Sequence, residues 1–138
     1  FRSFWMGGYE CATHINRRGE RLDMIAGTEH DTRALEDYQL LASEGILVVR
    51  DGLRWHLIER NGQYEFSSFL PMLRAAHQAG VQVIWDLCHY GWPDDVDLLS
   101  TGFVERFGKF VTAVARVMRN ESDEVPIYAP VNEISFLG

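Results

Sequence analysis

Four apolar segments of the chain alternate with three segments in which apolar residues recur at helical spacing. The apolar segments are rich in β-branched and aromatic residues, which favours extended strands. They cover residues 4–11, 46–50, 81–87 and 127–131, and the second continues loosely towards Trp55. The pattern therefore predicts four strands separated by three helices.

The helices are also predicted from residues that favour helix ends. Ser, Thr and Asp side chains can accept a hydrogen bond from the free N–H groups of a first turn, and Gly readily takes the left-handed conformation that follows a last turn. The expected starts are Asp31, then Ser67 or Ser68, then Thr101 or Gly102, and the expected stops of the first two helices are Gly45 and Gly80.

Strict alternation of strands and helices implies parallel strands joined by right-handed crossovers. Polar residues follow every strand: Glu10, residues 50–55, residues 89–92, and the pair Asn132 and Glu133. The carboxyl ends of such strands meet on one rim, so we expect these residues to lie together. Parallel sheets are normally covered on both faces, and four strands with three helices leave part of the sheet uncovered. The fold class is therefore predicted to be a TIM (β/α)8 barrel, of which residues 1–138 form the N-terminal half as part of a single domain.

Composition and charge exclude several classes of partner. Of 138 residues, 46% are hydrophobic and 24% are charged, as in ordinary soluble domains. The net charge of −7 and the absence of a Lys/Arg-rich run argue against nucleic acid and anionic membranes as partners. The two cysteines, Cys11 and Cys88, form no disulfide framework and are expected to be free and buried, which favours a cytoplasmic setting. Neither they nor the five histidines show metal-ligand spacing, so neither a metal nor a cofactor is expected.

Asn132 and Glu133 suggest chemistry because of their position after the last strand. A carboxyl group on the rim of an apolar barrel is expected to be partly desolvated and so able to stay protonated near neutral pH, as a general acid requires. The amide can both donate to and accept from a sugar hydroxyl. The structural alternative is a strand end closed by two polar residues.

Four motifs, in order along the chain, resemble those of the family 1 retaining glycoside hydrolases, the β-glucosidases. Gly8-Tyr9-Glu10 is similar to the family's Ser-Tyr-Gln, and residues 50–55 have the spacing of its Arg-Phe-Ser-Ile-Ser-Trp. Residues 87–93 resemble its Leu-Tyr-His-Trp-Asp-Leu-Pro, and Asn132-Glu133 resembles the start of its Asn-Glu-Pro. The resemblance implies a retaining glycosidase that binds a carbohydrate substrate.

Carried over position by position, the resemblance implies a role for each rim residue. Glu133 would be the general acid/base, and Asn132 would bind the sugar 2-hydroxyl. Arg50 would contact the nucleophilic carboxylate, and His89 would bind another hydroxyl. Tyr90 stands where the family has Trp.

Two residues differ from the family pattern, and the family's nucleophile is expected outside this chain. Glu10 replaces a glutamine that contacts sugar hydroxyls, and Ile134 replaces the proline after the catalytic pair. The family's nucleophile lies on a seventh strand, so it is expected outside this chain, in the remaining C-terminal half of the barrel.

Other interpretations of the same residues remain open. The protein is alternatively a carbohydrate-binding pseudo-enzyme, or another barrel enzyme that uses Glu10, His89 and Glu133 in different proton-transfer chemistry. Arg50 alternatively pairs with Asp51 or Glu44 beside it. Asp86 is unusual inside a strand and is expected to pair with an arginine of a neighbouring strand.

Overall fold

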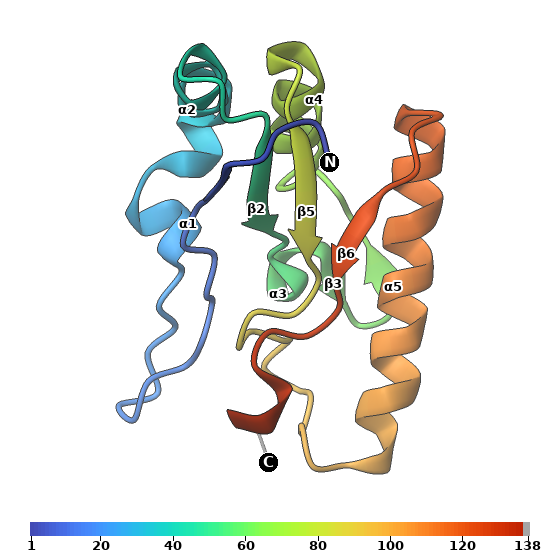
Figure 1. The fold of residues 1–138 in the computed structure, drawn as a ribbon. Coiled ribbons are helices and arrows are strands. Elements are labelled where there is room, and N and C mark those ends of the chain that lie inside the picture. Colours follow the sequence, from blue (N-terminus) through green and yellow to red (C-terminus); the bar gives the residue numbers. More distant parts are fainter. Residues whose placement is uncertain (137–138) are drawn as a thin grey trace.

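The computed structural model describes residues 1–136, and its centre is a four-stranded parallel sheet (Figure 1). The strands are β1 (Met6–Gly8), β2 (Val48–Gly52), β5 (Gln82–Asp86) and β6 (Ile127–Ala129), in the order β1-β2-β5-β6. All three pairings are parallel, which confirms the predicted direction and order of the four strands. Within the described residues, β1 and β6 are the two edges of the sheet.

Three long helices connect the strands: α2 (His30–Ser43), α4 (Leu70–Ala79) and α5 (Thr101–Glu121). Side chains alternate along each strand, so one face of the sheet contributes residues such as Val49, Val83 and Trp85 to the core shared with the helices. Trp85 is buried as part of this core and packs edge-on against Phe69. Phe110 and Val114 of α5 are also fully buried.

Both predicted helix stops and the predicted start of α5 at Thr101 are confirmed, whereas the starts of α2 and α4 differ from prediction. Gly45 and Gly80 follow α2 and α4 with φ values of 77° and 72°, in the left-handed region that glycine favours. The start of α2 differs from prediction because Asp31 does not cap it: its Oδ2 accepts a hydrogen bond from Arg54 Nη1 at 2.7 Å. Similarly, the Ser67 amide and hydroxyl both donate to Glu65, and α4 begins only at Leu70.

Several short elements were not predicted. They are α1 (Met24–Gly27), α3 (Trp55–Ile58), the antiparallel hairpin of β3 (Glu59–Arg60) and β4 (Gln63–Tyr64), and the 3-10 turn η1 (Ile134–Phe136). The expected extension of β2 beyond Arg50 is confirmed only as far as Gly52. It does not reach Trp55, which begins α3 and stacks on Phe110 with ring centroids 4.9 Å apart. The first strand is also shorter than predicted.

The arrowheads of β2, β5 and β6 point to the end of the molecule that holds the long loops and η1 (Figure 1). The carboxyl ends of the strands therefore open onto the same region. In the part of the chain described, no helix combines the length and apolar character needed to cross a membrane.

Candidate active site at the carboxyl ends of the strands

A hollow lies at the carboxyl ends of the parallel strands, and five of the six predicted site residues line it. The full lining is Glu10, Ala12, His14, Met24, His89, Tyr90, Asn132 and Glu133. These residues come from the segments that follow β1, β5 and β6, and from the start of α1. The sequence prediction that the polar strand-end residues share one rim is thus matched by their positions.

Arg50, the sixth predicted residue, lies beside the hollow and is fixed by two neighbours. Its Nε donates to Asp86 Oδ2 at 2.8 Å and its Nη2 donates to Asp86 Oδ1 at 3.0 Å. The same Nη2 also donates to Asn132 Oδ1. The alternative pairing of Arg50 with Asp51 or Glu44 is therefore wrong, and the expectation that Asp86 pairs with an arginine of a neighbouring strand is confirmed.

Parallel register explains why Arg50 and Asp86 meet. Arg50 stands opposite Ile84 on β5, and Asp86 lies two residues further along the same strand, so both side chains project from the same face of the sheet. Asp51 points the other way and accepts hydrogen bonds from Tyr38 and, at 2.8 Å, from His30.

The buried Asp86 carboxylate is stabilised in its ionised form. Desolvation by burial raises its pKa, but hydrogen bonds from His89 and Arg50 outweigh this effect, and the net pKa is lowered. In return, the hydrogen bond to Asp86 raises the pKa of Arg50. The pair therefore stays charged, and its bidentate geometry fixes the plane of the guanidinium.

His89 lies between Asp86 and Glu10. Its Nδ1 is 3.1 Å from Asp86 Oδ2 and 3.1 Å from Cys11 Sγ, while its Nε2 is 3.8 Å from Glu10 Oε1. Glu10 Oε1 also accepts the Ala12 backbone N–H at 2.9 Å. The imidazole is thus held from one side and presents its other nitrogen towards the hollow.

Tyr90 and Glu133 meet through a hydrogen bond from the phenol to Glu133 Oε2. This bond raises the pKa of Tyr90. Both residues have positive φ, 58° for Tyr90 and 43° for Glu133, a conformation that non-glycine residues adopt uncommonly. Such strained backbone often occurs at functional sites.

Glu133 differs from expectation in its surroundings. Its side chain is exposed, whereas the sequence argument required partial desolvation for a protonated general acid. The physical reason is that the chain bends away from the sheet after β6, with Glu133 at a positive φ directly before η1, and this leaves the carboxylate in contact with water. By contrast, the neighbouring Asn132 is only 8% exposed, and its backbone N–H donates to Cys88 O at 3.0 Å.

Sequence reasoning missed three residues at this site. His14 and Met24 line the hollow but belong to a polar loop and a short helix that carried no periodic signal. Cys11 is buried as predicted, but its contact with His89 spans 78 positions and has no local signature. Cys11, Asp86 and His89 also form a group of three side chains that could ligate a metal ion.

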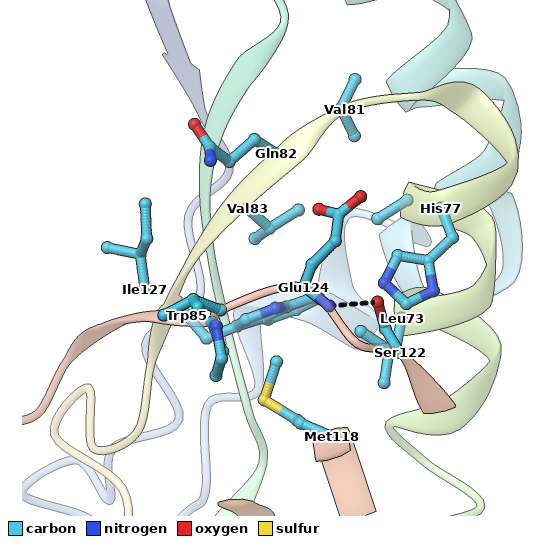
Figure 2. Close-up of a pocket in the computed structure, with 13 residues that line it drawn as sticks. Leu73, His77, Val81, Gln82, Val83, Trp85, Met118, Ser122, Glu124 and Ile127 are labelled. Atoms are coloured by element: carbon cyan, nitrogen blue, oxygen red, sulfur yellow. Dashed lines mark hydrogen bonds between the residues drawn. The ribbon is translucent and has the colours of Figure 1, made fainter. Parts of the chain in front are cut away.

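A second cavity lies at the opposite ends of β5 and β6, between α4 and α5 (Figure 2). Its volume is about 40 Å³, and residues such as Leu73, Val83, Trp85 and Met118 line it. The hydrogen bond drawn at its rim joins the Glu124 backbone N–H to Ser122 Oγ at 3.1 Å. Such a volume suits a water molecule, not a sugar ring, so the strand-end hollow is the better candidate site.

Of the comparisons with known proteins, the one with solved structures bears on the fold. No protein-family model matches the chain, and no curated protein sequence matches it significantly. Among solved structures, the exo-β-1,4-mannosidase Op5Man5 from Opitutaceae bacterium strain TAV5 is similar, with a TM-score of 0.71 and 18% identity over 95% of this chain and 25% of that one.

Two β-glucosidases show the same likeness. BglU from Micrococcus antarcticus has a TM-score of 0.60 and 20% identity, covering 90% of this chain and 27% of that chain. β-Glucosidase 2 from the fungus Trichoderma reesei has a TM-score of 0.60 and 23% identity, covering 76% and 24%. The chain spans about a quarter of the length of these proteins. Its parallel α/β fold is therefore that of one part of these barrel glycoside hydrolases.

Proposed function

We propose that residues 1–138 form the N-terminal half of a retaining β-glycosidase with a (β/α)8 barrel, of the β-glucosidase type. The observation that carries this proposal is the gathering of Glu10, His89, Tyr90, Asn132 and Glu133 around one hollow at the carboxyl ends of parallel strands. Active sites of such barrels lie at this end of the strands. The structural similarity to a mannosidase and to β-glucosidases supports a carbohydrate as substrate.

In this proposal, Glu133 protonates the glycosidic oxygen and later deprotonates the attacking water. The hydrogen bond from the Tyr90 phenol holds its carboxylate at the hollow. Asn132 binds the sugar 2-hydroxyl, a contact that strengthens in the transition state. Its Oδ1 is taken by Arg50, so its amide N–H groups are the part available to a ligand.

Recognition of the other hydroxyls falls to His89 and Glu10. The imidazole is fixed by Asp86 through Nδ1, which leaves Nε2 for the substrate. Glu10 offers a carboxylate where the family has an amide, so it accepts hydrogen bonds from hydroxyls without donating any.

The nucleophile is proposed to come from the remaining C-terminal half of the barrel. Retaining hydrolysis needs a second carboxylate about 5–5.5 Å from the acid/base, and Arg50 would contact it as that half closes over the rim. Closure would also cover the open edges β1 and β6. The two free, buried cysteines support a reducing, cytoplasmic setting.

The test is Glu133→Ala in the full-length protein, with Glu36→Ala on the exposed surface of α2 as control. Loss of the acid should reduce hydrolysis of an unactivated glycoside far more than the first step on a dinitrophenyl glycoside, whose leaving group needs no proton. The covalent intermediate should then accumulate, and azide should relieve it by attacking the sugar. Equal rates for Glu133→Ala and the parent on both substrates would refute the assignment.

One observation favours a second candidate, a carbohydrate-binding protein without hydrolysis. Glu133 is exposed and hydrogen-bonded to Tyr90, which is compatible with a binding role alone. The parent protein would then bind a β-glycoside in calorimetry but release no product, even from the dinitrophenyl glycoside. Turnover of that substrate by the parent excludes this candidate.

A further inference from the structure

Three potential metal ligands meet beside the hollow, at the point where the loops after β1 and β5 touch. Cys11 Sγ lies 3.1 Å from His89 Nδ1 and 3.5 Å from Asp86 Oδ2, and these last two atoms are 3.1 Å apart. The three atoms form a small triangle of sulfur, nitrogen and oxygen. Asp86 and His89 are only three positions apart, whereas Cys11 is 75 and 78 positions from them, so the fold brings the sulfur to this pair.

We propose that Cys11, Asp86 and His89 form a binding site for Zn²⁺ or a similar borderline-soft divalent cation. In a tetrahedral zinc site with ordinary bond lengths, neighbouring ligand atoms lie about 3.4–3.6 Å apart. The observed separations of 3.1, 3.1 and 3.5 Å are short of this by about half an ångström or less. Small side-chain rotations would therefore admit the ion.

Thiolate, imidazole and carboxylate are all ligands that zinc accepts, and three protein ligands with one open position are typical of accessible zinc sites. Such a set discriminates against Mg²⁺ and Ca²⁺, which prefer oxygen ligands alone. The chemistry of the cluster thus indicates the class of ion as well as its position.

The ion pair of Arg50 with Asp86 does not block the site. A carboxylate has about four lone-pair positions. Arg50 uses one on each oxygen, through Nε and Nη2. A further position on Oδ2 remains on the side of Cys11 and His89. Arg50 would then act behind the ligand, orienting the carboxylate as outer hydrogen-bond partners commonly do in metal sites.

The charge changes are balanced by loss of one proton. Zn²⁺ binding forms a Zn–S bond and breaks the S–H bond of Cys11, and the proton leaves to solvent. Asp86 binds through an oxygen lone pair. His89 binds as the neutral tautomer: the proton that Nδ1 shares with Asp86 moves to Nε2 by exchange with solvent, which frees the Nδ1 lone pair for the ion. Affinity should therefore rise with pH. The close packing of Gly52 on Cys11 keeps the sulfur in place, because a Cβ there would lie 2.6 Å from Sγ.

A cation reaches the cluster from the hollow. Cys11 and Asp86 are 1% and 0% exposed, while His89 lines the hollow and is partly accessible. The carboxylates of Glu10 and Glu133 on the same rim attract cations. Water would supply the fourth ligand. The ion takes Nδ1 of His89, so Nε2, the nitrogen proposed to face the sugar, stays available.

The experiment uses Co²⁺ as a spectroscopic probe for zinc in the full-length protein, with Zn²⁺ as competitor. A thiolate-to-cobalt charge-transfer band is expected in the near ultraviolet for the parent and should disappear on adding Zn²⁺. The band should be absent from Cys11→Ser, whose Zn²⁺ affinity should fall at least tenfold, and it should persist in the matched control Cys88→Ser, because Cys88 is buried but lies outside the cluster.

The variant His89→Gln gives a second, independent measurement. It leaves the core unchanged, so the proposal can be tested even if Cys11→Ser folds poorly. It should keep the far-ultraviolet circular dichroism of the parent and lose zinc affinity by at least tenfold. The proposal is overturned if the parent gives no band, if the band survives in Cys11→Ser, or if His89→Gln keeps the zinc affinity of the parent. This spectroscopic result is independent of glycoside hydrolysis.

Discussion

Replacing Asp86 by Asn tests how strongly one buried carboxylate holds the site together. The change keeps the size of the side chain and removes its charge. Asp86 is fully buried and accepts two hydrogen bonds from Arg50. Asn has a single oxygen acceptor, so at least one of these bonds must be lost, and the amide N–H₂ then faces either Arg50 or His89.

The expected cost follows from these contacts. A hydrogen bond to a charged group contributes about 1.5–3 kcal/mol. The Arg50 side chain is 44% exposed, so water replaces part of what it loses. We therefore expect Asp86→Asn to lower the free energy of unfolding by about 2 kcal/mol, which shifts a urea midpoint by about 1 M for an m-value near 2 kcal/mol/M.

Asp95→Asn is the matched control. Asp95 also accepts two hydrogen bonds from one guanidinium, at 2.7 and 3.0 Å from Arg106, but its side chain is 63% exposed. An exposed pair of this kind is worth less than about 1 kcal/mol. Urea unfolding followed by tryptophan fluorescence compares the two variants directly. Equal losses for both would show that burial of Asp86 is not what makes its ion pair strong.

The difference in stability between the parent and Asp86→Asn has a predictable pH dependence. The pKa of Asp86 is lowered in the folded protein, so its stabilising effect is present above the ordinary aspartate pKa of about 3.9 and is lost as the pH falls through the folded value. The difference in unfolding free energy between parent and Asp86→Asn should thus be constant near neutrality and shrink in acid. A difference that persists unchanged at pH 2 contradicts the reasoning.

Two further predictions concern the elements around the site. Burial lowers the pKa of His30, but hydrogen bonds to two carboxylates and their charges outweigh this effect, so the net pKa is raised. The contribution of His30 to the free energy of unfolding is therefore complete below about pH 6.5 and is lost as the pH rises through the folded pKa. Unfolding free energies measured from pH 5 to 9 should fall more steeply for the parent than for His30→Gln, and parallel curves would contradict this. Gly91→Ala should destabilise by about 1–3 kcal/mol, because its Cβ would lie 1.7 Å from Thr13 Oγ1. Gly108→Ala in α5 meets no atom within 4 Å and should stabilise by about 0.5–1 kcal/mol, so a thermal shift of the same sign in both would refute the clash.

The fold was predictable from the sequence because local signals and tertiary structure agree over most of the chain. Apolar strands, helical periodicity, and glycines after α2 and α4 all point to parallel βα units. The β3–β4 hairpin was also visible in principle: Asn61-Gly62 is a strong turn signal, and both residues have the positive φ that its turn requires. It was missed because its strands have only two residues each.

The start of α5 at Thr101 was predictable, but the start of α2 was less so because a long-range contact competes for its capping side chain. Asp31 has the right chemistry for a cap, but an ion pair with Arg54, 23 positions away, takes its carboxylate. Helix stops depend mainly on backbone conformation, which glycine determines locally. Signals that are satisfied within a few residues are therefore more reliable than signals that a distant partner can override.

The shared location of the candidate site residues was predictable, but not the contacts between them. Each polar residue follows a strand, so parallel topology alone brings them to one rim. Which partners they choose depends on register, and this explains why Arg50 binds Asp86 across β2 and β5 instead of its sequence neighbours. The exposure of Glu133 depends on what covers the rim, a property that no local pattern contains.

The burial of Asp86 lowers the stability of the fold, and only the position of this residue explains its presence. Burying a carboxylate is unfavourable unless it is paired, and a hydrophobic residue would pack there more cheaply. Its partners, however, are Arg50 and His89, two of the residues proposed to face the substrate side of the site. One fixed charge thereby orients both side chains before any ligand arrives, a form of preorganisation that binding and catalysis require. The same carboxylate also completes the triangle with Cys11, so sugar recognition and cation binding would depend on a single buried group.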